Sequence, residues 1–155
     1  MLMAESQLLK DSIHAKNHFI KQITIMKIMV CGPIGGVGID KILEMREFLE
    51  SEGFETVKQF SKGKDYSKIH DFRKKPMLVK KIIKHDLDCI KKADVLVVLP
   101  EPSFGASIEM FVAKNAKKKV ILFSSKPVPS PWPIGFSDIV VTSKNELVRK
   151  LHKIM

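Results

Sequence analysis

Apolar and polar positions form two kinds of run along the chain, and the order of these runs predicts the fold. Short apolar runs, typical of buried strands, occur at 25–31, 54–60, 95–99, 119–124 and 139–141. Apolar residues recur at helical spacing in 40–52, 76–92 and 106–116 and again from 143 to the end of the chain. This alternation predicts a doubly wound α/β fold of the Rossmann or flavodoxin type, a mainly parallel five-stranded sheet with helices on both faces.

Residues of particular conformational preference mark where these elements begin and end. Asp40 is expected to cap the first helix of the sheet domain, and Gly53 to end it. Pro76 is expected to open the second helix, and Ser143 with Glu146 to form a capping box on the last one. The polar, Lys-rich stretch 61–76 predicts a long and mobile loop, and 126–133 a Pro/Ser-rich loop that carries Trp132.

The first 25 residues differ from the rest. Between Ser6 and Ile23, apolar residues recur at near-helical spacing among Lys, Asp and His, which indicates an amphipathic helix docked on the domain or on a partner subunit. We therefore expect residues 1–25 to form an N-terminal extension, and residues 26–155 to form one domain with a core of its own.

Charge and cysteine content narrow the function classes. The net charge of +10 favours anionic ligands, nucleotides among them. The lysine pairs fall on expected helix faces or ends, where a solvated basic surface explains them, and no aromatic-rich nucleic-acid module accompanies them. Cys31 and Cys89 sit in apolar contexts, as in reduced cytoplasmic proteins. We expect no metal, no cofactor and no membrane span, since His and Cys are scattered and apolar runs are short.

Three constellations carry candidate chemistry. A glycine-rich turn, 32–38, follows the first strand, and it serves equally as a close approach to an anion or as a tight strand-to-helix turn. Asp86 and Asp88 lie on the second helix, about 200° apart, so at most one faces a site and both are otherwise solvated. Ser103 and Gly105 then precede Glu109, which stands among apolar neighbours where an α/β sheet binds ligands.

These segments, in this order and spacing, resemble the nucleoside 2-deoxyribosyltransferase family. The resemblance is nearest to its branch of 2'-deoxynucleoside 5'-monophosphate N-glycosidases and covers about residues 27–153. It rests on three segments: Cys31-Gly32-Pro33-Ile34-Gly35-Gly36, Asp86-Leu87-Asp88-Cys89-Ile90-Lys91-Lys92-Ala93-Asp94-Val95 and Pro102-Ser103-Phe104-Gly105-Ala106-Ser107-Ile108-Glu109.

The resemblance implies cleavage of the N-glycosidic bond of a (deoxy)nucleoside or its 5'-monophosphate, by hydrolysis or by base transfer. Glu109 would attack C1' as the nucleophile and form a glycosyl-enzyme, and Asp86 would orient Glu109, bind the sugar or assist proton transfer. Ser103 would bind the 5'-phosphate, with Gly105 beside it. The pocket for sugar and base would be lined by Cys31, Gly32, Ile34, Gly35 and Gly36. The resemblance also implies a homo-oligomer, a dimer or larger, in which neighbouring subunits close the site.

The chain departs from the pattern of the resemblance at a few positions. A basic residue of the glycine turn is replaced at Gly35 or Gly38, an aromatic before the Cys-Gly pair is Val30, and a glycine two residues after the nucleophile is Phe111. Loss of the basic residue bears on recognition of a 5'-phosphate, and Phe111 on helix packing beside Glu109. The alternative function is a nucleotide-binding or sensing module on the same fold, without turnover.

Overall fold

The computed structural model describes residues 25–35, 38–60, 66–100 and 103–155. Five parallel strands form one sheet in the order β2-β1-β3-β4-β5. The strands are β1 (Lys27–Cys31), β2 (Glu55–Thr56), β3 (Val95–Val98), β4 (Lys119–Phe123) and β5 (Ile139–Val141). The helices are α2 (Gly38–Ser51), α3 (Pro76–Lys92), α4 (Phe104–Asn115), α5 (Pro131–Phe136) and α6 (Lys144–Ile154). The predicted doubly wound α/β fold is confirmed.

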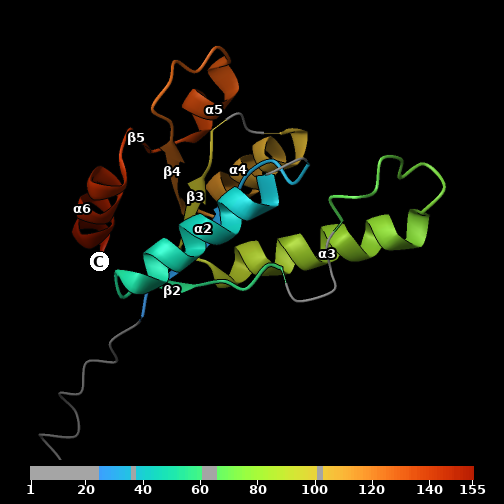
Figure 1. Cartoon of the computed structure of the whole chain (residues 1–155), viewed down its shortest axis with the longest axis horizontal. Coiled ribbons are helices and arrows are strands. Elements are labelled where there is room, and N and C mark those ends of the chain that lie inside the picture. Colours follow the sequence, from blue (N-terminus) through green and yellow to red (C-terminus); the bar gives the residue numbers. More distant parts are fainter. Residues whose placement is uncertain (1–24, 36–37, 61–65, 101–102) are drawn as a thin grey trace, which may run out of the picture.

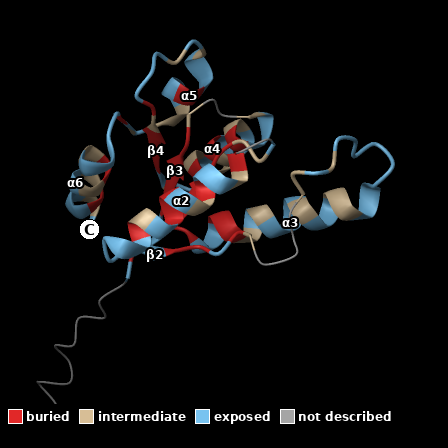
Figure 2. Cartoon of the chain, in the orientation of Figure 1, coloured by how far each residue is buried: buried red, intermediate tan, exposed pale blue. Residues whose placement is uncertain are grey.

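Each face of the sheet has a core of its own, because successive side chains of a strand point to opposite faces. Ile28 and Val30 of β1 pack with α2 and α6. Met29 and Cys31 of the same strand pack with α3 and α4. The strands and the inner faces of the helices are accordingly the buried parts of the molecule in Figure 2.

The longest helix, α3, behaves differently along its length. It runs from Pro76 to Lys92, the range that the sequence predicts, with proline in the first turn and two lysines in the last. Its buried residues, Cys89 and Ile90, lie near the C-terminal end. The N-terminal half extends beyond the sheet in Figure 1, so only the second half of the helix is packed on the core.

Two element ends differ from the sequence prediction. The helix α2 begins at Gly38, whose amide donates to the carbonyl of Gly35 at 3.1 Å, so Asp40 lies inside the first turn rather than at the N-cap. Gly53 does end this helix, with a φ of 89° that favours glycine. The expected strand at 54–60 is paired only over the two residues of β2.

The C-terminal third holds two further corrections. Trp132 lies in the short helix α5, not in a loop as expected, because the prolines at its start occupy first-turn positions that need no amide donor. On α6, Ser143 Oγ accepts from the amide of Glu146 at 3.2 Å as predicted. The Glu146 carboxylate accepts from the Thr142 amide at 2.9 Å rather than from Ser143, so the capping box is only half formed.

The expected amphipathic helix at 6–23 lies outside the described residues, as does the segment 61–65 of the predicted loop. Residues 66–75 of that loop contain neither helix nor strand. Within the described part of the chain, no helix is both long enough and apolar enough to cross a membrane.

Candidate active site

The functional residues gather where the strand order reverses. β1 and β3 are adjacent central strands, and the chain continues from them to opposite sides of the sheet. Ligands of open α/β sheets bind outside the carboxyl ends of the strands at such a point. Cys31 ends β1, and Ser103 and Glu109 follow β3 on α4, so the sequence-predicted candidates meet at this edge.

A small cavity lies at this edge. Its volume is about 60 Å³, and it is lined by Gly32, Ile34, Ile42, Gln59, Phe60, Asp86, Ser103, Gly105, Ala106 and Glu109. Most of the candidate site residues therefore lie on one cavity. Gly35 is exposed and does not line it, and Gly36 lies outside the described residues.

Glu109 and Asp86 are held together by a residue that the sequence did not single out. Gln59 Nε2 donates to Asp86 Oδ1 at 3.2 Å and to Glu109 Oε1 at 3.4 Å. Gln59 is only 5% exposed, and its Oε1 is buried with no hydrogen-bond partner. A buried acceptor without a partner costs free energy that a ligand donor would recover, so this oxygen marks a place for a ligand group.

Both carboxyl groups of the pair have raised pKa values. Burial, and then the nearby negative charge of Asp86, raises the pKa of Glu109 to about 7, although the side chains of Cys31 and Gln59 donate to it. Burial also raises the pKa of Asp86, against the opposing effects of Gln59 and His85. The pair is thus set to hold one proton near neutral pH, mainly on Glu109, as closely spaced carboxyl groups do.

Contrary to the sequence prediction, Cys31 does not line the small cavity but lies against Glu109. Its thiol is buried and hydrogen-bonds to Glu109, and the pKa of this thiol is raised well above its ordinary value by burial and by the Glu109 charge. A thiol in this state stays protonated and donates. Cys31 and Cys89 are both buried free cysteines.

The remaining acidic candidate lies elsewhere. Asp88 pairs with Lys84 at 2.8 Å and with Lys91 at 3.6 Å on the outer face of α3. The prediction that at most one of the two helix carboxylates faces the site is therefore confirmed, and Asp86 is that one.

Ser103 has two uses open to it. It is the N-cap of α4, where its Oγ accepts from the amide of Ala106 at 3.3 Å. The same side chain lines the small cavity and also a wider hollow of about 520 Å³ formed with Phe104, Ser107, Ser130 and Trp132. The small cavity therefore adjoins a space large enough for more of a ligand.

The departures from the expected motif have clear structural consequences. A Cβ at Gly38 would lie 1.8 Å from the Pro33 carbonyl oxygen, so position 38 has no room for a side chain. A Cβ at Gly35 would meet nothing within 4 Å. Phe111 contacts Phe136 of α5, with ring centroids 5.5 Å apart.

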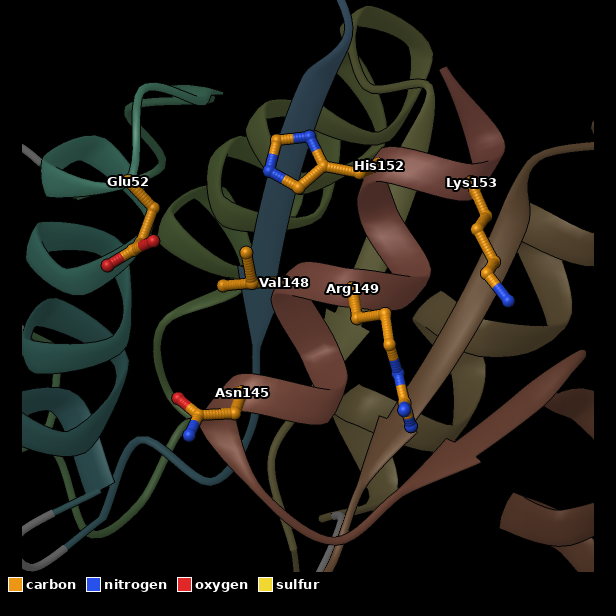
Figure 3. Close-up of a pocket in the computed structure, with 6 residues that line it drawn as sticks. All are labelled: Glu52, Asn145, Val148, Arg149, His152 and Lys153. Carbon is orange, nitrogen blue, oxygen red and sulfur yellow. The ribbon is translucent and has the colours of Figure 1, made fainter.

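A second hollow lies apart from the carboxylates, between the end of α2 and α6 (Figure 3). Its volume is about 530 Å³, and it is lined by Glu52, Asn145, Val148, Arg149, His152 and Lys153. The buried polar side-chain atoms without a partner, among the described residues, belong to Arg46 and Gln59. Neither residue lines this hollow, so no buried polar group without a partner indicates a ligand there. The described residues also hold no cluster of three or more metal-ligating side chains.

The fold and the site together define an α/β protein with a partly buried carboxyl pair at the switch point of its sheet. No protein-family model matches the chain. No curated protein sequence matches it either.

Solved structures resemble it more clearly. The CMP N-glycosidase BcmB of Clostridium botulinum has a TM-score of 0.51 and 20% identity, over 81% of this chain and 98% of that one. A 2-deoxyribosyltransferase of Bacillus psychrosaccharolyticus has a TM-score of 0.56 and 17% identity, over 79% and 90%. A conserved protein of Enterococcus faecalis V583 has a TM-score of 0.60 and 16% identity, over 85% and 100%. The chain therefore shares its fold with a CMP N-glycosidase and with a 2-deoxyribosyltransferase.

Proposed function

We propose that this protein cleaves the N-glycosidic bond of a (deoxy)nucleoside or of its 5'-monophosphate. The observation that carries the proposal is the pair Asp86 and Glu109, joined through Gln59 Nε2 on one cavity at the switch point. Similarity in fold to an N-glycosidase and to a 2-deoxyribosyltransferase supports the same chemistry. Fold alone does not define function, so the carboxyl pair is the stronger argument.

In the proposed reaction, a carboxylate oxygen of Glu109 attacks C1' as the bond from C1' to the base nitrogen breaks. The bonding electron pair leaves with the base, which takes up a proton. A negatively charged nucleophile stabilises the positive charge that develops on the sugar. Water or a second base then attacks C1' and releases Glu109, which gives hydrolysis or base transfer.

The proton balance of the site fits these roles. Since the pKa of Glu109 is about 7 in the empty site, attack requires that this group first loses its proton. Asp86, held against the same Gln59 amide, would relay a proton from water to the leaving base. Base release is therefore expected to rise with pH through the region of about 7.

The dimensions of the site suggest how a substrate would lie. The small cavity of about 60 Å³ is well below the usual volume of a small-molecule pocket, so it would hold only the reacting centre. The wider hollow beside Ser103 would take the rest of the nucleoside or its phosphate. Ser103 Oγ and the first amides of α4 would bind a 5'-phosphate there.

The test is incubation with a panel of nucleosides, deoxynucleosides and their 5'-monophosphates, with and without an acceptor base. Free base and new nucleoside are measured by chromatography. Wild type is expected to release base, and Glu109→Gln to do so at least about 1000-fold more slowly, as for loss of other covalent nucleophiles. Glu47→Gln, at an exposed position of α2, is the matched control and should behave as wild type.

Absence of base release from every donor would refute the enzymatic function. Binding of a mononucleotide without turnover would instead support a sensing module. Binding that weakens steeply with salt would indicate contact with nucleic-acid phosphates. In the enzymatic case, intact-mass spectrometry should detect a sugar adduct in wild type that Glu109→Gln lacks.

We also propose that the protein acts as a homo-oligomer. Large apolar side chains of α4 and α5 are exposed beside the wider hollow, with Phe104 94%, Trp132 65% and Ile108 62% accessible. Exposed apolar groups that gather in this way are typical of protein–protein contacts. A second copy seated there would cover the hollow that Ser103 shares with the carboxylate cavity.

A further inference from the structure

His85 precedes Asp86 on α3 and makes one contact with the opposite wall of the site. Its Nε2 lies 2.7 Å from the backbone carbonyl oxygen of Gln59. Because a carbonyl only accepts hydrogen bonds, the ring must carry its hydrogen on Nε2. The same nitrogen lies 3.7 Å from Cys89 Sγ, so the ring is held between α3 and the segment after β2.

That segment has few other anchors close to residue 59. After β2, the amide of Val57 donates to Ile28 at 2.8 Å, and the amide of Gln59 donates back to Val57 at 3.0 Å. Among the described hydrogen bonds of residues 57–60, the bond from His85 is the one that ties the Gln59 backbone to α3. This hydrogen bond therefore fixes the backbone position from which the Gln59 side chain extends.

The Gln59 amide depends on this placement because it is held at one end only. Its Nε2 is shared by Asp86 and Glu109 at 3.2 and 3.4 Å, both longer than the most common hydrogen-bond distance, while its Oε1 has no partner. A small displacement of the backbone away from the carboxylates would therefore break both bonds.

We infer that His85 is a positioning residue, which holds the Gln59 amide between Asp86 and Glu109 through its bond to the Gln59 carbonyl. Its effect on turnover rests on the proposed glycosidic function, whereas its effect on the site geometry does not. The titratable groups that act on Glu109 are Cys31 from β1 and Asp86 from α3. The charge of Glu109 in turn raises the pKa of Cys89 on α3, after the larger effects of burial and Asp86. His85 acts on Asp86 by its charge as well.

The experiment compares three variants with wild type. His85→Leu removes the donor, His85→Gln keeps an N–H donor near the position of Nε2, and His70→Leu is a control at an exposed histidine before α3. His85→Leu is expected to lower kcat roughly 10- to 100-fold with little change in KM, as misplacement of reacting groups does. The acidic limb of its pH profile should move to higher pH, because the Gln59 donor that lowers the pKa of Glu109 is no longer held in place.

His85→Gln should restore most of kcat and the pH profile, and His70→Leu should match wild type. Since His85→Gln keeps the hydrogen bond but not the charge of a histidine, it separates the positioning effect from the electrostatic one. A profile of His85→Leu that equals wild type would overturn the inference. So would a His85→Gln variant as impaired as His85→Leu, since packing of the ring would then be what matters.

A second readout needs no activity. The carboxyl carbon of Glu109, assigned by its loss in Glu109→Gln, is titrated by NMR in each variant. A titration at higher pH in His85→Leu, reversed in His85→Gln, supports the inference even if wild type releases no base; an unchanged titration overturns it. If His85→Leu does not fold, His85→Asn, too short to reach the carbonyl, replaces it.

Discussion

At the scale of single residues, the surroundings of Glu109 disfavour the charged form of its carboxyl group. This carboxyl group is partly buried beside a second carboxyl group, with a thiol and an amide as its hydrogen-bond donors. A residue kept in this state at a cost to stability is typical of a functional site.

The cost predicts a dependence of stability on pH. Between the ordinary pKa of 4.5 and the folded-state value of about 7, the unfolded chain has lost the Glu109 proton but the folded protein keeps it. The folded state then binds more protons, so the free energy of unfolding falls as pH rises through this window. The shift corresponds to roughly 3 kcal/mol at most.

Glu109→Gln removes this titration, so the variant should become more stable than wild type as pH rises towards about 8. Urea unfolding measured at intervals between about pH 5 and about pH 8 would show the two curves diverging. Glu47→Gln should follow wild type throughout. Parallel curves for wild type and Glu109→Gln would contradict the prediction.

The sequence predicts the acidic half of the site but not the residue that joins it. Glu109 stands out because its sequence neighbours are apolar. Asp86 stands out because it begins one of the three segments that carry the family resemblance. Gln59 is 27 residues from Asp86 and 50 from Glu109 along the chain, so its role exists only after the sheet has formed. The signal that could have found it is a polar side chain just beyond the second strand, at the edge where parallel strands end.

At the scale of elements, the end of α4 is a point of backbone strain. Lys117 has a φ of 58°, and among the described residues it alone is a non-glycine residue in the left-handed region. It follows the C-cap Ala116, in the position where helices commonly have glycine. A side chain in this conformation costs about 1 kcal/mol or somewhat more.

Lys117→Gly is therefore expected to raise the free energy of unfolding by about 1 kcal/mol, measured by urea or thermal denaturation. Lys117→Ala keeps a Cβ in the same conformation and is the matched control, for which no gain is expected. Equal stabilisation by both variants would show that loss of a lysine, not relief of strain, is responsible.

Elements were predictable where local signals agree with the fold. The range of α3 follows from Pro76 at its start and from the helical spacing of its apolar residues. In α5, two prolines and a glycine within six residues argue against a helix. The contact of Phe136 with Phe111 of α4, which cannot be read from the local sequence, accompanies that helix.

At the scale of the whole molecule, the apolar side chains of α4 and α5 form a surface next to the site. This aromatic patch consists of Phe104, Ile108, Phe111, Trp132 and Phe136, which line one hollow of about 330 Å³ with Ser107. Burial of this patch against a second copy would remove apolar surface from water, which stabilises an assembly of two copies.

Phe104→Ser combined with Trp132→Ser is expected to shift the protein from oligomer to monomer in analytical ultracentrifugation over a range of concentrations. Met77→Ser, at an exposed apolar side chain on the projecting half of α3, should leave the assembly unchanged. Wild type that remains monomeric at every concentration, or a double variant that assembles as wild type does, would contradict the role of the patch.

The turn after β1 limits which of its positions can gain a side chain. One of its glycines, at position 38, is pressed against the carbonyl of Pro33, and another, at position 35, faces open space. Of these two, only position 35 accepts a side chain without rebuilding the turn. A basic side chain can therefore be added to this turn at residue 35, whereas residue 38 is closed to any side chain.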